Sequence, residues 1–214
     1  MSAREEILSR IRGATADVST PPGETPRATV LDPGDPDRTT LDGFAEIVAD
    51  YRAEVVRVRA DALPAAITTA LRDHRCGSVV VPDGLDPAWV EAAGAAAEVR
   101  WERDTMTHAE LDATDAVVTA AAVGIASTGT IVLDHRPDQG RRALTLVPDT
   151  HVCVVRADQV VPDVPEGVER LRPDPAGARP LTWISGPSAT SDIELERVEG
   201  VHGPRTLIML LVEA

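Results

Sequence analysis

Hydroxyl side chains, glycines and one histidine gather in two glycine–proline turns near the C-terminus. The first turn is Ser185-Gly186-Pro187-Ser188, with Thr190 close behind it, and the second is Gly200-Val201-His202-Gly203-Pro204. Turns of this composition hold backbone and side-chain groups in fixed positions. Loops that follow the strands of α/β folds carry many ligand sites. We therefore predict a binding site for a phosphate or carboxylate here, at the end of a buried strand over residues 181–184.

The acidic segment between the two turns has the S-x-x-E pattern of a capping box. Ser191 would cap a short helix, and Glu194, which follows Asp192, would reach back to the cap. Free N–H groups at such a helix start attract anions. The alternative is that the hydroxyls, N–H groups and carboxylates of this region only satisfy one another.

His202 lies on flexible backbone, and Pro204 biases Gly203 towards an extended conformation. A histidine on such a loop can act as an acid, a base or a donor to an oxyanion. Alternatively, its ring bonds a carbonyl and fixes the turn. The remaining histidines show no metal-ligand spacing, so we expect no metal site.

Two further motifs contain groups that bind anions. Thr128-Gly129-Thr130 lies between apolar stretches, where its glycine most simply makes a turn. Gly140-Arg141-Arg142 places a glycine beside paired arginines, which can clamp an anion. Arginines that pair with acids on the surface are the alternative. No Ser-His-Asp or Cys-His arrangement can be assigned from spacing, since such triads are spatial.

The composition excludes several kinds of chemistry. All 21 basic residues are arginine, so there is no lysine for a Schiff base or a P-loop. A net charge of -14 argues against binding to nucleic acid or to an anionic membrane. Two distant cysteines, Cys76 and Cys153, cannot supply the four thiolates of an iron–sulfur cluster. The N-terminus lacks an apolar signal core and no run reaches membrane-spanning length, so we expect a soluble cytoplasmic protein without membrane insertion.

The chain divides into three predicted parts: an amphipathic helix over 1–12, a proline-rich linker or arm over 13–38, and one domain over 39–214. In the domain short strands and helices alternate, with an aliphatic core because aromatic content is only 2%. This alternation predicts an α/β sandwich with a largely parallel sheet. The predicted strands cover residues 51–60, 78–81, 98–101, 115–119, 131–133, 143–147, 151–155, 181–184 and 206–212. The predicted helices cover residues 41–49 (with Thr40 as cap), 63–74, 87–97 and 164–171.

These motifs together resemble the LUD domain family, and more closely its lactate-utilisation protein C branch. They occur in the family's order and approximate spacing, and the likeness is strongest from residue 115 onward. The residues that carry it are Thr128-Gly129-Thr130, Gly140-Arg141-Arg142, Pro148, Ser185-Gly186-Pro187-Ser188, Thr190, Asp192-Ile193-Glu194 and Gly200-Val201-His202-Gly203-Pro204.

The resemblance implies a three-layer α/β/α sandwich related to ribose-phosphate isomerase and CoA transferases. It also implies a role in oxidising L-lactate to pyruvate beside two partner proteins that carry iron–sulfur clusters. One position departs from the family, which often has a glutamate where this chain has Ser127. A covalent acyl-enzyme step at that position is therefore not expected.

The leading hypothesis is an accessory subunit that binds lactate, pyruvate or a phosphate-bearing anion and holds no cofactor of its own. The site residues expected to bind this ligand are Thr128, Gly129, Thr130, Arg141, Arg142, Ser185, Gly186, Ser188, Thr190, Asp192, Glu194, His202 and Gly203. The alternatives are a stand-alone isomerase- or CoA-transferase-like enzyme for a phosphorylated or CoA-linked substrate, and a structural scaffold.

Overall fold

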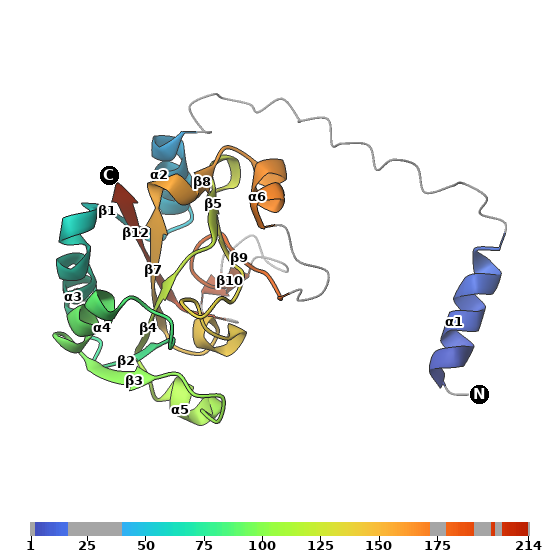
Figure 1. Cartoon of the computed structure of the whole chain (residues 1–214), viewed down its shortest axis with the longest axis horizontal. Helices are drawn as coiled ribbons and strands as arrows, with labels where there is room; N and C mark the ends of the chain where they lie inside the picture. Colours follow the sequence, from blue (N-terminus) through green and yellow to red (C-terminus); the bar gives the residue numbers. More distant parts are fainter. Residues whose placement is uncertain (1–2, 17–39, 172–178, 191–197, 200–202, 214) are drawn as a thin grey trace. The chain divides into compact units, whose positions relative to one another are not determined.

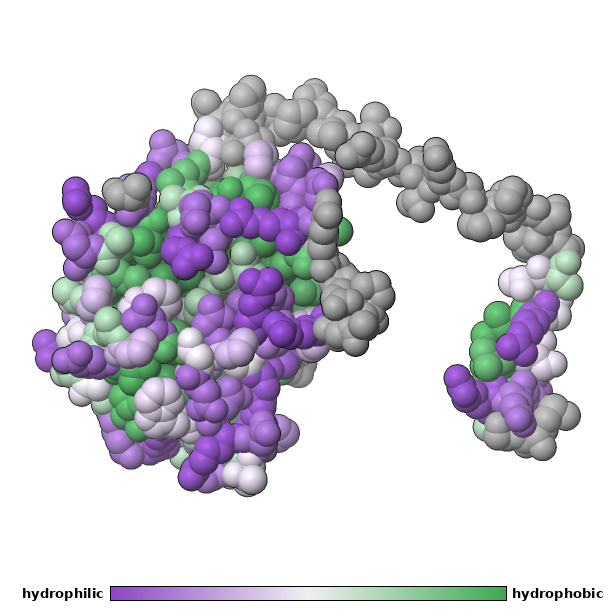
Figure 2. Space-filling model, viewed as in Figure 1, coloured by the Kyte–Doolittle hydropathy of each residue, from purple (hydrophilic) through white to green (hydrophobic). Residues whose placement is uncertain are grey.

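The computed structural model describes residues 3–16, 40–171, 179–190, 198–199 and 203–213. The chain forms two units, Met1–Asp32 and Pro33–Ala214. In the first, helix α1 (Ala3–Ala14) has charged residues along one side and an apolar stripe along the other (Figure 2), where Ile7 and Ile11 are more than half exposed. Most of the predicted arm, and the predicted short helix that begins at Ser191, lie outside the described residues.

A six-stranded sheet forms the centre of the second unit (Figure 1). Its strand order is β1-β12-β7-β4-β2-β3, and every neighbouring pair is parallel. The strands are β1 (Glu54–Arg59), β2 (Ser78–Val81), β3 (Glu98–Trp101), β4 (Ala116–Ala120), β7 (Thr150–Arg156) and β12 (Thr206–Glu213). This sheet confirms the predicted α/β class.

A second, four-stranded sheet has the order β8-β5-β6-β9 and is largely antiparallel. It consists of β5 (Val123–Ile125), β6 (Thr130–Leu133), β8 (Val160–Val161) and β9 (Thr182–Ile184). A two-residue ladder joins β10 (Ala189–Thr190) to β11 (Val198–Glu199). The second sheet is a feature that the sequence did not predict, since β6 and β9 were assigned to a single parallel sheet.

The helices connect the strands and cover the sheets. They are α2 (Leu41–Asp50), α3 (Leu63–Asp73), α4 (Pro87–Gly94), α5 (His108–Asp112) and α6 (Val164–Leu171), with 3-10 turns η2 (Ala60–Ala62), η3 (Ala126–Thr128), η4 (Arg142–Thr145) and η5 (Ala157–Gln159). The predicted cap of α2 is confirmed: the Thr40 hydroxyl accepts a hydrogen bond from the Gly43 N–H at 3.0 Å.

The two faces of the six-stranded sheet bury separate aliphatic cores, because successive side chains on a strand point to opposite faces. In β12, Ile208 and Leu210 pack with α3 and α4, which lie together on one face (Figure 1). Met209 and Leu211 pack on the other face with Phe44 of α2 and with β6. The second sheet therefore covers part of this face, and α6 packs against its β5. The flanking helices confirm the sandwich architecture.

One predicted strand, over residues 143–147, is wrong. The segment instead forms the 3-10 turn η4, in which Leu144 is fully buried against Val117 and Leu111. A short apolar run does not distinguish a strand from a buried turn. The turn brings the guanidinium of Arg142 back to Thr145, where Nη1 lies 3.1 Å from the threonine hydroxyl.

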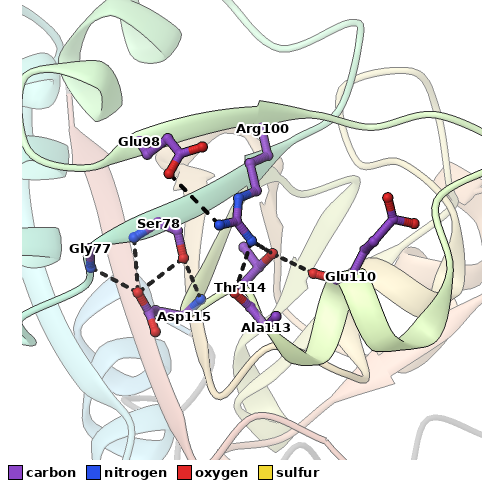
Figure 3. A network of polar contacts seen from close by, with 8 residues as sticks. All are labelled: Gly77, Ser78, Glu98, Arg100, Glu110, Ala113, Thr114 and Asp115. Carbon is purple, nitrogen blue, oxygen red and sulfur yellow. Dashed lines mark hydrogen bonds and ion pairs between the residues drawn. The ribbon is translucent and has the colours of Figure 1, made fainter.

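Polar contacts join the amino ends of β2, β3 and β4 (Figure 3). Asp115 Oδ2 accepts hydrogen bonds from the N–H groups of Gly77 and Ser78 at 2.8 and 2.9 Å, and from the Ser78 hydroxyl at 3.0 Å. Arg100 on β3 donates to the Thr114 hydroxyl at 2.9 Å. These bonds hold the amino ends of β2, β3 and β4 together. In the described part of the chain no helix is both long and apolar enough to cross a membrane.

Candidate functional site

A cavity of about 450 Å³ lies between the two sheets, beside the amino ends of β7 and β12. This volume is typical of a small-molecule site. Its walls come from the loop after β9, the Gly203-Pro204 turn, η4 and the first residues of β7 and β12. The lining residues are Arg142, Thr145, His151, Trp183, Ile184, Ser185, Gly186, Pro187, Ser188, Ala189, Gly203, Pro204 and Leu207.

The strand that leads into the cavity is only partly buried, contrary to the prediction for residues 181–184. Thr182 is buried, but Trp183 is 44% exposed and Ile184 is intermediate. The reason is that β9 is an edge strand of the second sheet and, among the described strands, pairs only with β6. Its exposed side chains are therefore free to line the cavity.

The two predicted turns do come together. The Ser188 N–H donates to the Pro204 carbonyl at 2.8 Å, which joins the loop after β9 to the turn before β12. Gly186 has φ of 111°, and a β-carbon there would lie 2.8 Å from both Cβ and the carbonyl oxygen of Tyr51. Glycine is thus required for the loop to fold against the end of α2.

A chain of hydroxyls connects the first turn to the Thr128-Gly129-Thr130 motif. Thr130 Oγ1 lies 2.8 Å from both Thr128 Oγ1 and Ser185 Oγ. Ser185 lines the cavity, whereas Thr130 is buried behind it. The two threonines therefore orient the Ser185 hydroxyl, and Gly129 between them packs against Ile47.

The paired arginines face different surroundings. Arg141 lies in a second cavity, with its Nε 3.3 Å from Glu102 Oε1 and its Nη2 2.5 Å from the Met106 carbonyl. Arg142 lines both cavities, and its Nη1 donates to the carbonyl and hydroxyl of Thr145. Among the described residues, no carboxylate lies within ion-pair distance of Arg142. Its charge is therefore available to an anion in the first cavity.

His151 also lines this cavity and was not predicted as a site residue. It is 1% exposed, and its Nε2 lies 2.8 Å from the Thr119 hydroxyl. Burial, helped by the charge of Arg142, lowers the pKa of His151 to about 3. The ring is neutral at physiological pH. In a sequence, a histidine in an apolar strand is usually interpreted as a core residue. Its place in the cavity wall is seen only in the structure, where its ring bonds Thr119 on the neighbouring strand.

The buried neutral His151 predicts a specific pH dependence of stability. The unfolded chain takes up a proton near pH 6.5, whereas the folded chain takes it up only near pH 3. The contribution of His151 is therefore complete above pH 6.5 and is lost as the pH falls towards 3, by up to about 1.4 kcal/mol per pH unit.

Urea unfolding at pH 7, 6 and 5 measures this loss. His151→Gln should flatten the decline in unfolding free energy relative to wild type, and the exposed His108→Gln should leave it unchanged. An equally steep decline in the His151 variant would show that other groups cause it.

Four of the predicted site residues do not line the cavity: Thr128, Gly129, Thr130 and Arg141. Ser127, at the position where the family often has a glutamate, donates to Asp163 Oδ1 at 2.6 Å and so ties η3 to the start of α6. Asp192, Glu194 and His202 lie outside the described residues, as does the side chain of Thr190. Within the described ranges, no three His, Cys, Asp or Glu residues form a metal-binding group.

Comparison with known proteins identifies the family of this chain. The pattern of the LUD domain matches residues 41–212, which run from α2 into β12 and include every residue that lines the cavity. The chain belongs to the LUD domain family. Lactate utilization protein C of Deinococcus radiodurans is 52% identical over 172 residues, covering 80% of this chain and 79% of that protein.

Two further comparisons agree with this assignment. Lactate utilization protein C of Geobacillus kaustophilus is 30% identical over 70% of this chain and 68% of that protein. A crystal structure of a DUF162 family protein from Deinococcus radiodurans has a TM-score of 0.67 and 43% identity, covering 81% of this chain and 96% of that one. The resemblance of this LUD domain to the lactate utilization protein C branch is confirmed.

Proposed function

We propose that this LUD domain binds a small carboxylate, lactate or pyruvate, in the cavity between its two sheets. In this proposal it is the accessory ligand-binding subunit of an iron–sulfur-dependent system that oxidises L-lactate to pyruvate. The names of its relatives support the process. The cavity supports the ligand class, because it combines a cation that has no described acidic partner with ordered hydroxyls.

The observation that carries the proposal is the position of Arg142. A guanidinium presents several N–H donors in one plane, and only Nη1 is used in the bonds to Thr145. The other donors match the two oxygens of a carboxylate. Apolar side chains of Leu207, Ile184 and Trp183 on the cavity walls suit a short alkyl group.

The division of labour with iron–sulfur partners rests on cysteine chemistry. The chain has two cysteines, and both are buried. Burial raises the pKa of Cys153 to about 12, which disfavours the thiolate that a cluster requires. In the proposal, partner proteins therefore carry the redox centres, and this chain supplies the binding site.

Thermal unfolding with L-lactate, pyruvate and inorganic phosphate tests the ligand class. A ligand at about 100 times its dissociation constant should add roughly 2.7 kcal/mol to stability. We expect both carboxylates to raise the melting temperature more than phosphate does. No shift with any of the three at high concentration would favour a structural scaffold. Copurification of iron–sulfur proteins from cells grown on lactate tests the proposed assembly separately.

The second cavity favours a different candidate, the stand-alone enzyme. Glu102 lines it, and burial is the main cause that raises the pKa of this carboxyl, opposed by the Arg141 N–H and guanidinium. A carboxyl of raised pKa beside arginines is typical of acid–base sites. Turnover of a sugar phosphate or a CoA ester by the purified protein, abolished by Glu102→Gln, would support this candidate over the accessory subunit.

A further inference from the structure

A buried polar chain runs from the wall of the cavity into the core through His151, Thr119 and Cys153. The three residues lie on β7 and β4, with Thr119 beside Cys153 in the register, and each is at most 1% exposed. Thr119 Oγ1 lies 2.8 Å from His151 Nε2 and 3.8 Å from Cys153 Sγ. Burying polar groups costs free energy that hydrogen bonds must offset. The presence of three such residues in a row therefore indicates a role beyond packing.

The second ring nitrogen of His151 is available to a ligand. The side chain of His151 lines the cavity. Its Nε2 is bonded to Thr119, whereas its Nδ1 has no hydrogen-bond partner among the described residues. The ring is neutral, so it offers one hydrogen bond and no charge. Arg142 lines the same cavity, and its positive charge contributes to lowering the pKa of the His151 ring.

The groups behind His151 allow Nδ1 to act as acceptor or donor. If Thr119 accepts the Nε2 proton, its own hydroxyl donates to Cys153 and Nδ1 carries a lone pair. If Thr119 donates to Nε2, the Cys153 thiol donates to Thr119 and Nδ1 carries the proton. The thiol keeps its hydrogen at neutral pH. Each arrangement keeps one proton on the ring and leaves Thr119 bonded on both sides.

We propose that His151 recognises the oxygen on the carbon next to the carboxylate that Arg142 holds. The cavity then selects 2-hydroxy and 2-oxo monocarboxylic acids over acids without that oxygen. A hydroxyl donates to Nδ1, and a keto oxygen accepts from it. This inference rests on the proposed function, because the carboxylate must first bind at Arg142.

Titration of the full chain with L-lactate, pyruvate and propionate tests the inference. One lost hydrogen bond predicts propionate binding about 10-fold weaker than lactate in the wild type. In His151→Leu, lactate should fall to the affinity of propionate, which should stay within about twofold of its wild-type value. Equal binding of all three acids to the wild type, or a preference that survives in His151→Leu, overturns this inference and leaves the proposed function standing. Failure of all three to bind overturns both.

Nuclear magnetic resonance of protein labelled with ¹⁵N in its histidines provides a second measurement, made on the wild-type protein. The His151 resonances are assigned as those that are missing from the spectrum of His151→Gln. L-lactate should shift its Nδ1 resonance, and propionate at the same occupancy should not. An Nδ1 resonance that saturating lactate leaves unchanged overturns the inference.

Discussion

Arg142→Gln is expected to weaken the binding of L-lactate, pyruvate and propionate by roughly 10- to 100-fold. The reason is that hydrogen bonds to charged groups contribute about 1.5–3 kcal/mol each, and about 1.4 kcal/mol corresponds to tenfold in affinity. Folding should change little, because the bonds of Arg142 to described residues stay within η4, at Thr145. Calorimetric titration of the three acids, with melting curves for each protein, measures both effects.

Two matched variants control for the lost charge. Arg59→Gln removes an arginine that is 77% exposed and does not line the cavity, so it should leave carboxylate binding unchanged. Arg141→Gln should reduce stability, because it leaves the carboxylate of Glu102, 12% exposed, without its guanidinium partner. If Arg141→Gln abolished binding and Arg142→Gln did not, the carboxylate would belong to the second cavity.

Gly129→Ala is expected to destabilise the domain by about 3 kcal/mol. The residue has φ of 59°, a conformation that costs a non-glycine residue roughly 1–2 kcal/mol. A β-carbon there would lie 2.5 Å from Ile47 Cγ2 and 3.1 Å from the Ile47 backbone carbon, and overpacking of this kind costs about 1–3 kcal/mol. Urea unfolding at neutral pH gives the change in unfolding free energy.

Gly94→Ala is the matched control, because the added carbon would meet only Val99 at 3.5 Å, an ordinary contact. It should lie within about 0.5 kcal/mol of wild type. A Gly129 variant as stable as this control would mean that α2 can move away from η3. The expected result assigns Gly129 to packing, although it lies in a motif that resembles the family's binding residues.

Sequence patterns predicted all six strands of the main sheet, each of which has at least four residues. The predicted bounds of β2 and β3 are those of the structure, and β12 extends one residue beyond the prediction. The second sheet was missed for a physical reason. β5 has three residues and β8 has two, too few for a period to show, and no local signal tells which sheet a strand joins.

Sequence spacing does not show which way a side chain points, and this limited the prediction of the site. Arg141 and Arg142 are adjacent, so the sequence treated them as one clamp. Arg141 is extended, with φ of −73° and ψ of 157°, and η4 begins at Arg142, which directs Arg141 to Glu102. His151 was missed because its partner Thr119 lies 32 positions earlier in the chain. Contacts between strands of this kind follow from topology and not from spacing.

The most direct test of the account is a crystal structure of the full chain with L-lactate bound. We predict one lactate in the cavity between the two sheets, with its carboxylate on the Arg142 guanidinium and its hydroxyl at His151 Nδ1. Lactate bound instead beside Glu102 and Arg141, or an unoccupied cavity at a lactate concentration that saturates binding in solution, would contradict the assignment of this site.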